Sequence, residues 1–119
     1  MIYTNIEEQV ENLPYMTRVI NEMAKDDALD VCYTKHSKDQ MASRGITIGD
    51  LLFVFRTGIV VSYQGKGTHK EDRNIHKYKI NGICLKNDRE IGVVVLVEVD
   101  RLKNPAIKIQ DIVTTMWND

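Results

Sequence analysis

The chain has 119 residues, of which 43% are hydrophobic and 28% are charged. This balance is typical of a globular protein and argues against a largely disordered one. The length is enough to build one hydrophobic core without metals or disulfides, so we expect a single domain over residues 1–119. Cys32 and Cys84 stand in apolar stretches without a Cys-x-x-Cys spacing, which predicts buried thiols rather than a disulfide or a redox site.

The net charge of −1 conceals an uneven distribution along the chain. Residues 1–30 contain seven acidic and two basic residues, whereas residues 31–90 contain eleven basic and six acidic residues. An acidic N-terminal segment is therefore joined to a basic body, which indicates an interaction surface unless the two parts simply attract each other. The sequence has no signal peptide and no apolar run of the roughly 20 residues that span a bilayer, so we expect a cytoplasmic protein with no membrane partner.

The first half of the chain has helical signals. Residues 4–7 (TNIE) resemble a capping box, and Pro14 interrupts the apolar pattern, which predicts a broken or kinked helix over 5–13 and 15–25. This helix forms an acidic extension over residues 1–27. A short strand is expected over 29–33, then a helix over 37–43 that ends at Gly45. A further helix begins at 47–50 (TIGD) by the same capping pattern and ends before Gly58.

From residue 59 onward the apolar period changes to that of strands. We expect strands over 59–63, 75–85, 90–100 and 106–116, because these segments are rich in β-branched and aromatic residues and are separated by turn-forming residues. The sequence therefore predicts an α+β fold in which N-terminal helices pack on one face of a four-stranded, mainly antiparallel sheet.

The common signatures of enzymes and metal sites do not occur in the sequence. There is no phosphate-binding loop, no G-x-S-x-G nucleophile turn and no H-E-x-x-H motif, and residues 65–67 (GKG) are interpreted as a hairpin turn. His69 and His76 have no further ligands at a spacing typical of zinc. We therefore expect neither a metal nor a cofactor.

Residues 66–79 contain a cluster of basic side chains. Its members are Lys66, His69, Lys70, Arg73, His76, Lys77 and Lys79, and the acids among them are Glu71 and Asp72. Histidine and cationic side chains can cleave RNA without a metal, by moving protons and stabilising the charged transition state. We take Arg73 and His76 as candidate catalytic residues, and Lys66, Lys70, Lys77 and Lys79 as candidate RNA-binding residues. A merely basic, solvated hairpin loop is the alternative interpretation.

Residues 33–58, YTKHSKDQMASRGITIGDLLFVFRTG, resemble the opening of a small-domain family related to the RelE and BrnT toxins. Its members begin with a His, then an Arg-Gly-Ile, then a helix ending in Gly. The segments NDREIGVVVLVEVD and DIVTTMW resemble later strands of that family, so the resemblance covers residues 33–117. Two positions depart from its pattern, Ser37 after the His and Asp88 before the Arg.

This resemblance implies a RelE/barnase-like fold and a toxin-type endoribonuclease that acts on RNA or at the ribosome. It also implies catalytic roles for the residues at the motif positions, His36, Arg44, Arg89 and Thr114. Structural roles are the alternative for two of them, since His36 could bond to a strand carbonyl and Arg44 could pair with Asp50.

A different class of function is a non-catalytic protein-binding module or inhibitor of the same fold, of the kind that mobile elements encode. Its partner would be an antitoxin or a target protein, bound through the acidic helix. In a nuclease the same helix could cover the basic face as a built-in inhibitor. A homodimer formed through the N-terminal helix or an edge strand is a third expectation.

Overall fold

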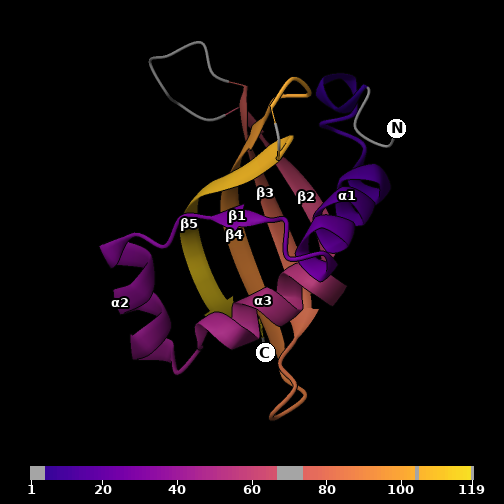
Figure 1. Cartoon of the computed structure of the whole chain (residues 1–119). Coiled ribbons are helices and arrows are strands. Elements are labelled where there is room, and N and C mark those ends of the chain that lie inside the picture. Colours follow the sequence, from indigo (N-terminus) through magenta and orange to yellow (C-terminus); the bar gives the residue numbers. More distant parts are fainter. Residues whose placement is uncertain (1–4, 67–73, 104, 119) are drawn as a thin grey trace.

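The computed structural model describes residues 5–66, 74–103 and 105–118. Helices precede strands along the chain, with one short strand between the first two α-helices (Figure 1). The helical elements are η1 (Ile6–Glu8, a 3-10 turn), α1 (Leu13–Lys25), α2 (Lys35–Arg44) and α3 (Ile48–Thr57). The strands are β1 (Asp30–Val31), β2 (Ile59–Lys66), β3 (Ile75–Ile83), β4 (Glu90–Val99) and β5 (Ile107–Trp117).

The described strands form one sheet in the order β1-β5-β4-β3-β2. The last four strands of the chain form the expected antiparallel meander, and β1 adds a fifth strand that runs parallel to β5. The expected α+β fold is confirmed, and its arrangement of three α-helices on a mostly antiparallel sheet is consistent with that of RelE.

Strand alternation separates the sheet into two faces of different character. One face carries the core residues Tyr78, Ile80, Val93 and Val95, which are buried together with side chains from α1 and α3. The other face, here called the open face, carries the alternate residues of the same strands. Its members include Lys77, Lys79, Val94, Leu96, Glu98, Lys108, Asp111 and Thr114, as the pairing register places them. In Figure 1, α1 and α3 lie on one side of the sheet and α2 lies beside β5.

The expected helix over 5–13 is wrong, and Pro14 has the opposite role from the predicted one. Only the short turn η1 forms there, and Pro14 is the second residue of α1 rather than its interruption. Proline is tolerated in the first helical turn because the N–H that it lacks has no intrahelical partner at that position. The side chain of Asn12 caps this helix by accepting the N–H of Tyr15 at 3.1 Å. Thr4, the start of the predicted capping box, lies outside the described residues.

Helix α1 is an integral part of the hydrophobic core. Met16, Val19, Ile20 and Met23 are all buried, and the helix packs against α3 and β2. It therefore lies on the face of the sheet opposite to Lys77 and Lys79 and does not cover those lysines, as a built-in inhibitor of that face would.

Both cysteines are free, and only one of them is buried. Cys84 is buried as predicted, whereas Cys32, next to the short strand β1, is exposed. Among the described residues, no helix has the length and apolar character that crossing a membrane requires.

Candidate functional site

Helix α2 runs along the part of β5 that lies beyond its pairing with β1. Three hydrogen bonds join the helix and the strand in matching order. They are Thr34 Oγ1 to Asp111 Oδ1 at 3.4 Å, the Thr115 N–H to Gln40 Oε1 at 2.7 Å, and the Trp117 indole N–H to the Arg44 carbonyl at 2.8 Å. The helix thus satisfies backbone and side-chain groups along a strand edge that would otherwise be open.

The sequence fixes both ends of α2. The Thr34 side chain caps its start by accepting the N–H of Ser37 at 3.1 Å. Gly45 ends it with a φ of 69°, a left-handed conformation that glycine adopts without steric cost. Met41 is buried and holds the middle of the helix against the core. The position of the helix beside β5 is therefore specified by capping and by one apolar anchor.

Trp117 brings two of the predicted motif residues to one place. Its indole N–H binds the carbonyl of Arg44, and the guanidinium of Arg89 lies 4.1 Å from the centroid of its ring. A cation over an aromatic face is attracted by the ring quadrupole. The end of α2 and the start of β4 are thereby joined through the last residue of β5.

The other two motif residues, His36 and Thr114, lie on α2 and β5. His36 is in the first turn of α2, and Thr114 is a half-buried residue of β5 on the open face, opposite Val94. We call the set His36, Arg44, Arg89, Thr114 and Trp117 the α2 edge. Two of the four positions that the resemblance selected, Arg44 and Arg89, thus meet at Trp117, while His36 and Thr114 lie elsewhere on α2 and β5 along the same edge of the sheet.

Among the described residues, neither His36 nor Arg44 has the partner that a structural role would require. His36 is exposed, and within the described ranges it makes no hydrogen bond or ion pair. Asp50, the expected partner of Arg44, instead pairs with Lys86 at 3.4 Å and accepts the Thr47 N–H at 2.9 Å. Both motif side chains are therefore available to a ligand.

The environment of Asp50 explains why it stays ionised. Partial desolvation opposes ionisation, but hydrogen bonds from the backbone and side chain of Thr47 and the charge of Lys86 outweigh it, so the pKa of Asp50 is lowered. Asp50 and Thr47 form the capping box that was predicted at the start of α3. The Asp50 carboxylate therefore has a structural role, as part of the cap of α3 and as the partner of Lys86.

His76 lies away from the α2 edge, on the helix-covered face of the sheet, and is only 5% exposed. The Tyr63 hydroxyl lies 2.7 Å from Nδ1, and Nε2 contacts the side-chain carbonyl of Asn74. An amide oxygen accepts only, so Nε2 carries the proton and Tyr63 donates to Nδ1. Burial and the nearby charge of Lys66 lower the pKa of His76. The lowered pKa favours the neutral ring, and both ring nitrogens are occupied, so His76 lies outside the site.

The candidate RNA-binding lysines that the structure describes do not form one cluster. Lys77 and Lys79 project from the open face of β3, as alternation predicted, on the opposite side from His76. Lys66 is the last residue of β2 and pairs in register with His76. Lys70, and the candidate catalytic Arg73, lie outside the described residues.

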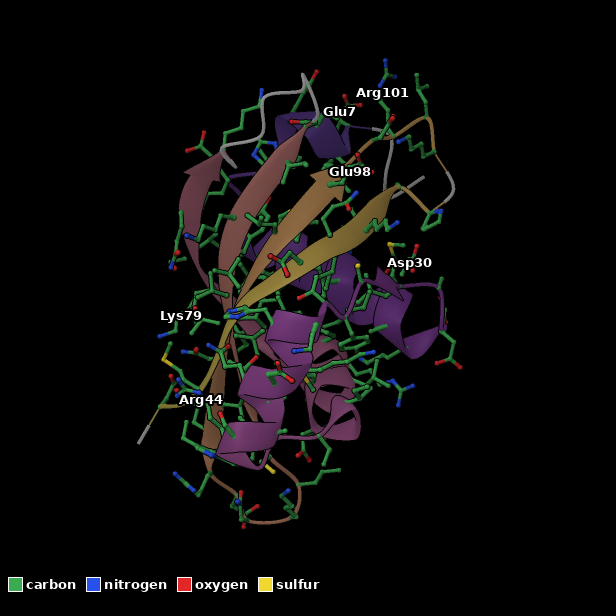
Figure 2. The ribbon with its side chains drawn as sticks, turned by 90° about the vertical axis from the view of Figure 1, so that its left-hand side faces the viewer. Glu7, Asp30, Arg44, Lys79, Glu98 and Arg101 are labelled. Atoms are coloured by element: carbon green, nitrogen blue, oxygen red, sulfur yellow. The ribbon has the colours of Figure 1, made fainter. Side chains whose placement is uncertain are left out.

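Several cations near the α2 edge have no acidic partner. Elsewhere, arginines and lysines pair with carboxylates, as in Arg56 with Asp27 at 3.0 Å and Arg101 with Glu7 at 3.2 Å. By contrast, Arg44, Lys77 and Lys79 form no ion pair with any described residue. Figure 2 shows Arg44 and Lys79 well away from Glu7 and Glu98, which lie at the other end of the molecule. This part of the surface is suited to bind anions.

Residues 33–117 match the model of a domain of unknown function, DUF4258. The chain belongs to this family. The DUF4258 match begins just before the cap of α2 and ends at Trp117, so it includes the whole α2 edge and leaves out α1. Comparison with curated proteins and with solved structures gives no significant match. The resemblance to RelE and BrnT toxins therefore rests on short motifs and on the arrangement of the fold.

Sequence reasoning did not identify Trp117 and Gln40 as parts of this site. Trp117 is the only tryptophan and stands within the quoted DIVTTMW segment, which was a signal that could have found it. Gln40 has no such signal, because its role depends on where α2 lies against β5. Within the described ranges no group of His, Cys, Asp or Glu residues is arranged to hold a metal ion.

Proposed function

We propose that this DUF4258 domain binds single-stranded RNA at the α2 edge and cleaves it without a metal ion. The observation that supports this most is the alignment of α2 with β5, which places His36, Arg44, Arg89 and Thr114 along one edge beside cations without acidic partners. Phosphate groups bind where such cations are available, and arginine can contact two phosphate oxygens at once.

Each residue has a distinct role in this reaction. His36 accepts the proton of a ribose 2′-hydroxyl, and the 2′-oxygen then attacks the adjacent phosphorus. Arg44 and Arg89 bind the charged phosphate, and the Thr114 hydroxyl donates to a non-bridging oxygen. The bond from phosphorus to the 5′-oxygen breaks, and water protonates that oxygen. The products are a 2′,3′-cyclic phosphate and a new 5′-hydroxyl end.

Incubation of the purified full chain with single-stranded RNA in EDTA tests this function. We expect cleavage that leaves 2′,3′-cyclic phosphate and 5′-hydroxyl ends. Arg44→Ala should reduce the rate, while Ser43→Ala, an exposed neighbour on the same helix, should not. Intact RNA in EDTA, or cleavage that requires added Mg²⁺, would refute the proposal.

A protein-binding role is the second candidate, and one observation favours it. A groove of about 540 Å³ lies at one end of β2 and β3 and is lined mainly by apolar groups. Ile59 and Leu85 on its rim are 61% and 70% exposed. Contiguous exposed apolar side chains often mark protein interaction sites, such as those for an antitoxin, a target protein or a second copy.

This alternative makes a different prediction about RNA. A pure protein-binding module should show negligible RNA affinity even at low salt, where phosphate contacts are strongest. Light scattering of the wild type and of Leu85→Ser would show whether the groove joins two copies. A dimer that the substitution dissociates, together with absent RNA binding, would favour this function over cleavage.

A further inference from the structure

A second, polar pocket lies at the end of the sheet where β4 turns into β5. Its volume is about 510 Å³, which is within the range of small-ligand sites. Polar side chains line most of it, namely Glu7, Glu98, Asp100, Lys103, Lys108 and Gln110. Figure 2 shows Glu98 at the same end of the molecule as Glu7 and Arg101, away from Lys79 and Arg44. The α2 edge therefore does not include this pocket.

Glu98 is the central group of the pocket. It is only 9% exposed, although it projects from the open face next to Leu96 and pairs in register with Ile75 and Lys108. Desolvating a carboxylate is costly, and even a paired one in such a place often contributes no more to stability than an apolar residue of similar size. This position is therefore poorly explained by stability alone.

The contacts of Glu98 leave one of its oxygens available. Gln110 Nε2 donates to Oε1 at 3.2 Å, and Lys103 Nζ lies 3.5 Å from the same oxygen. No described residue donates a hydrogen bond to Oε2. An ionised carboxylate has about four acceptor sites, so Glu98 can accept two further hydrogen bonds from a ligand.

We propose that this pocket binds a guanine base of the RNA, a subsite that rests on the proposed function. The Watson–Crick edge of guanine presents two adjacent donors, N1–H and the N2 amino group, followed by the acceptor O6. Glu98 accepts from the two donors, and Lys103 donates to O6. Adenine and cytosine place a ring acceptor beside their amino group, and uracil has a single N–H between two carbonyls. Reading of such base edges is typical of single-stranded RNA recognition.

The open face provides a path between the pocket and the α2 edge. Val94 pairs in register with Thr114 of β5 and with Lys79 of β3. Glu98 follows Val94 by four residues on β4, which corresponds to roughly 13 Å along the strand. Lys77 lies between them, opposite Leu96. A short stretch of single-stranded RNA can span that distance with its phosphates on the lysines, so a base in the pocket is compatible with chemistry at the α2 edge.

Binding of uncleavable oligonucleotides tests the subsite separately from catalysis. Four 2′-O-methyl RNA pentamers of otherwise uniform uridine would carry guanosine, inosine, adenosine or uridine at the central position. By fluorescence anisotropy at low salt, we expect the guanine pentamer to bind at least about tenfold more tightly than the others. Inosine is the sharpest comparison, because it lacks only the N2 amino group.

Two variants and a matched control complete the test. Glu98→Gln should remove the preference for guanine, while Glu90→Gln, at the start of the same strand, should keep it. Lys103→Ala, on an exposed side chain, should weaken guanine binding and serves as a second variant if Glu98→Gln does not fold. Equal binding of all four pentamers, or a preference that survives Glu98→Gln, would overturn the subsite. If the RNA is still cleaved, that result leaves the proposed function intact.

Discussion

Trp117 donates its indole N–H to the backbone carbonyl of Arg44 at 2.8 Å, across 73 positions of the sequence. The contact joins the last residue of β5 to the last residue of α2. Because Arg89 also lies over the same indole ring, one side chain positions both arginines of the α2 edge. Trp117 therefore acts on the site through other residues and is a positioning residue in the proposed reaction.

Trp117→Phe should separate the hydrogen bond from the ring contact. The phenyl ring keeps an aromatic face for Arg89 but has no N–H for the Arg44 carbonyl. We expect a loss of about 1 kcal/mol in the free energy of unfolding, measured in urea, together with weaker RNA binding. Unchanged stability and unchanged RNA affinity would show that this contact does not position the end of α2.

Arg44→Ala tests phosphate binding through the dependence on salt. A side chain that neutralises one phosphate displaces counterions, so its removal should reduce the slope of log K against log salt by about 1. Lys25→Ala removes an exposed cation at the end of α1, far along the chain from the α2 edge, and should leave the slope unchanged. Equal slopes for both variants and the wild type would argue against a phosphate contact at Arg44.

His76 predicts a dependence of stability on pH. Burial first, and the charge of Lys66 second, lower its pKa from the ordinary value of 6.5. Below that value the unfolded chain binds a proton that the folded chain does not, so the free energy of unfolding should decrease as the pH falls below about 6.5. The contribution is fully present above that pH.

Urea unfolding of the wild type and of His76→Gln between pH 7.5 and pH 5.5 measures this effect. The wild type should lose more stability across the range than the variant, which lacks the titrating group. The same loss in both proteins would mean that other groups cause the pH dependence. RNA cleavage should persist in the variant, because His76 lies outside the α2 edge.

Local signals in the sequence predicted the second half of the helical region well. Gly45 adopts the left-handed conformation expected at a helix end, and Thr47 and Asp50 form the predicted capping box. These features depend on a few neighbouring residues, and capping chemistry specifies them directly. Pro14 was misread because proline can either begin a helix or interrupt it, and the cap at Asn12 decided between the two.

Strand alternation correctly placed His76 and Lys77 on opposite faces of the sheet, but it could not tell which face the helices cover. That choice depends on packing between distant segments, such as the hydrogen bond that the Val60 N–H donates to Thr17 Oγ1 of α1. The parallel pairing of β1 with β5 is equally non-local. The sequence therefore offered the motif residues as candidates, whereas the meeting of Arg44 and Arg89 at Trp117 required the structure.

The most direct test of the account compares RNA cleavage by His36→Gln and Ser43→Ala, both exposed positions on α2, in EDTA. We predict that His36→Gln lowers the rate at least about 100-fold, as removal of a general base does, with RNA affinity nearly unchanged. Ser43→Ala should cleave like the wild type. Equal rates for His36→Gln and the wild type would contradict the central claim that the α2 edge is the catalytic site.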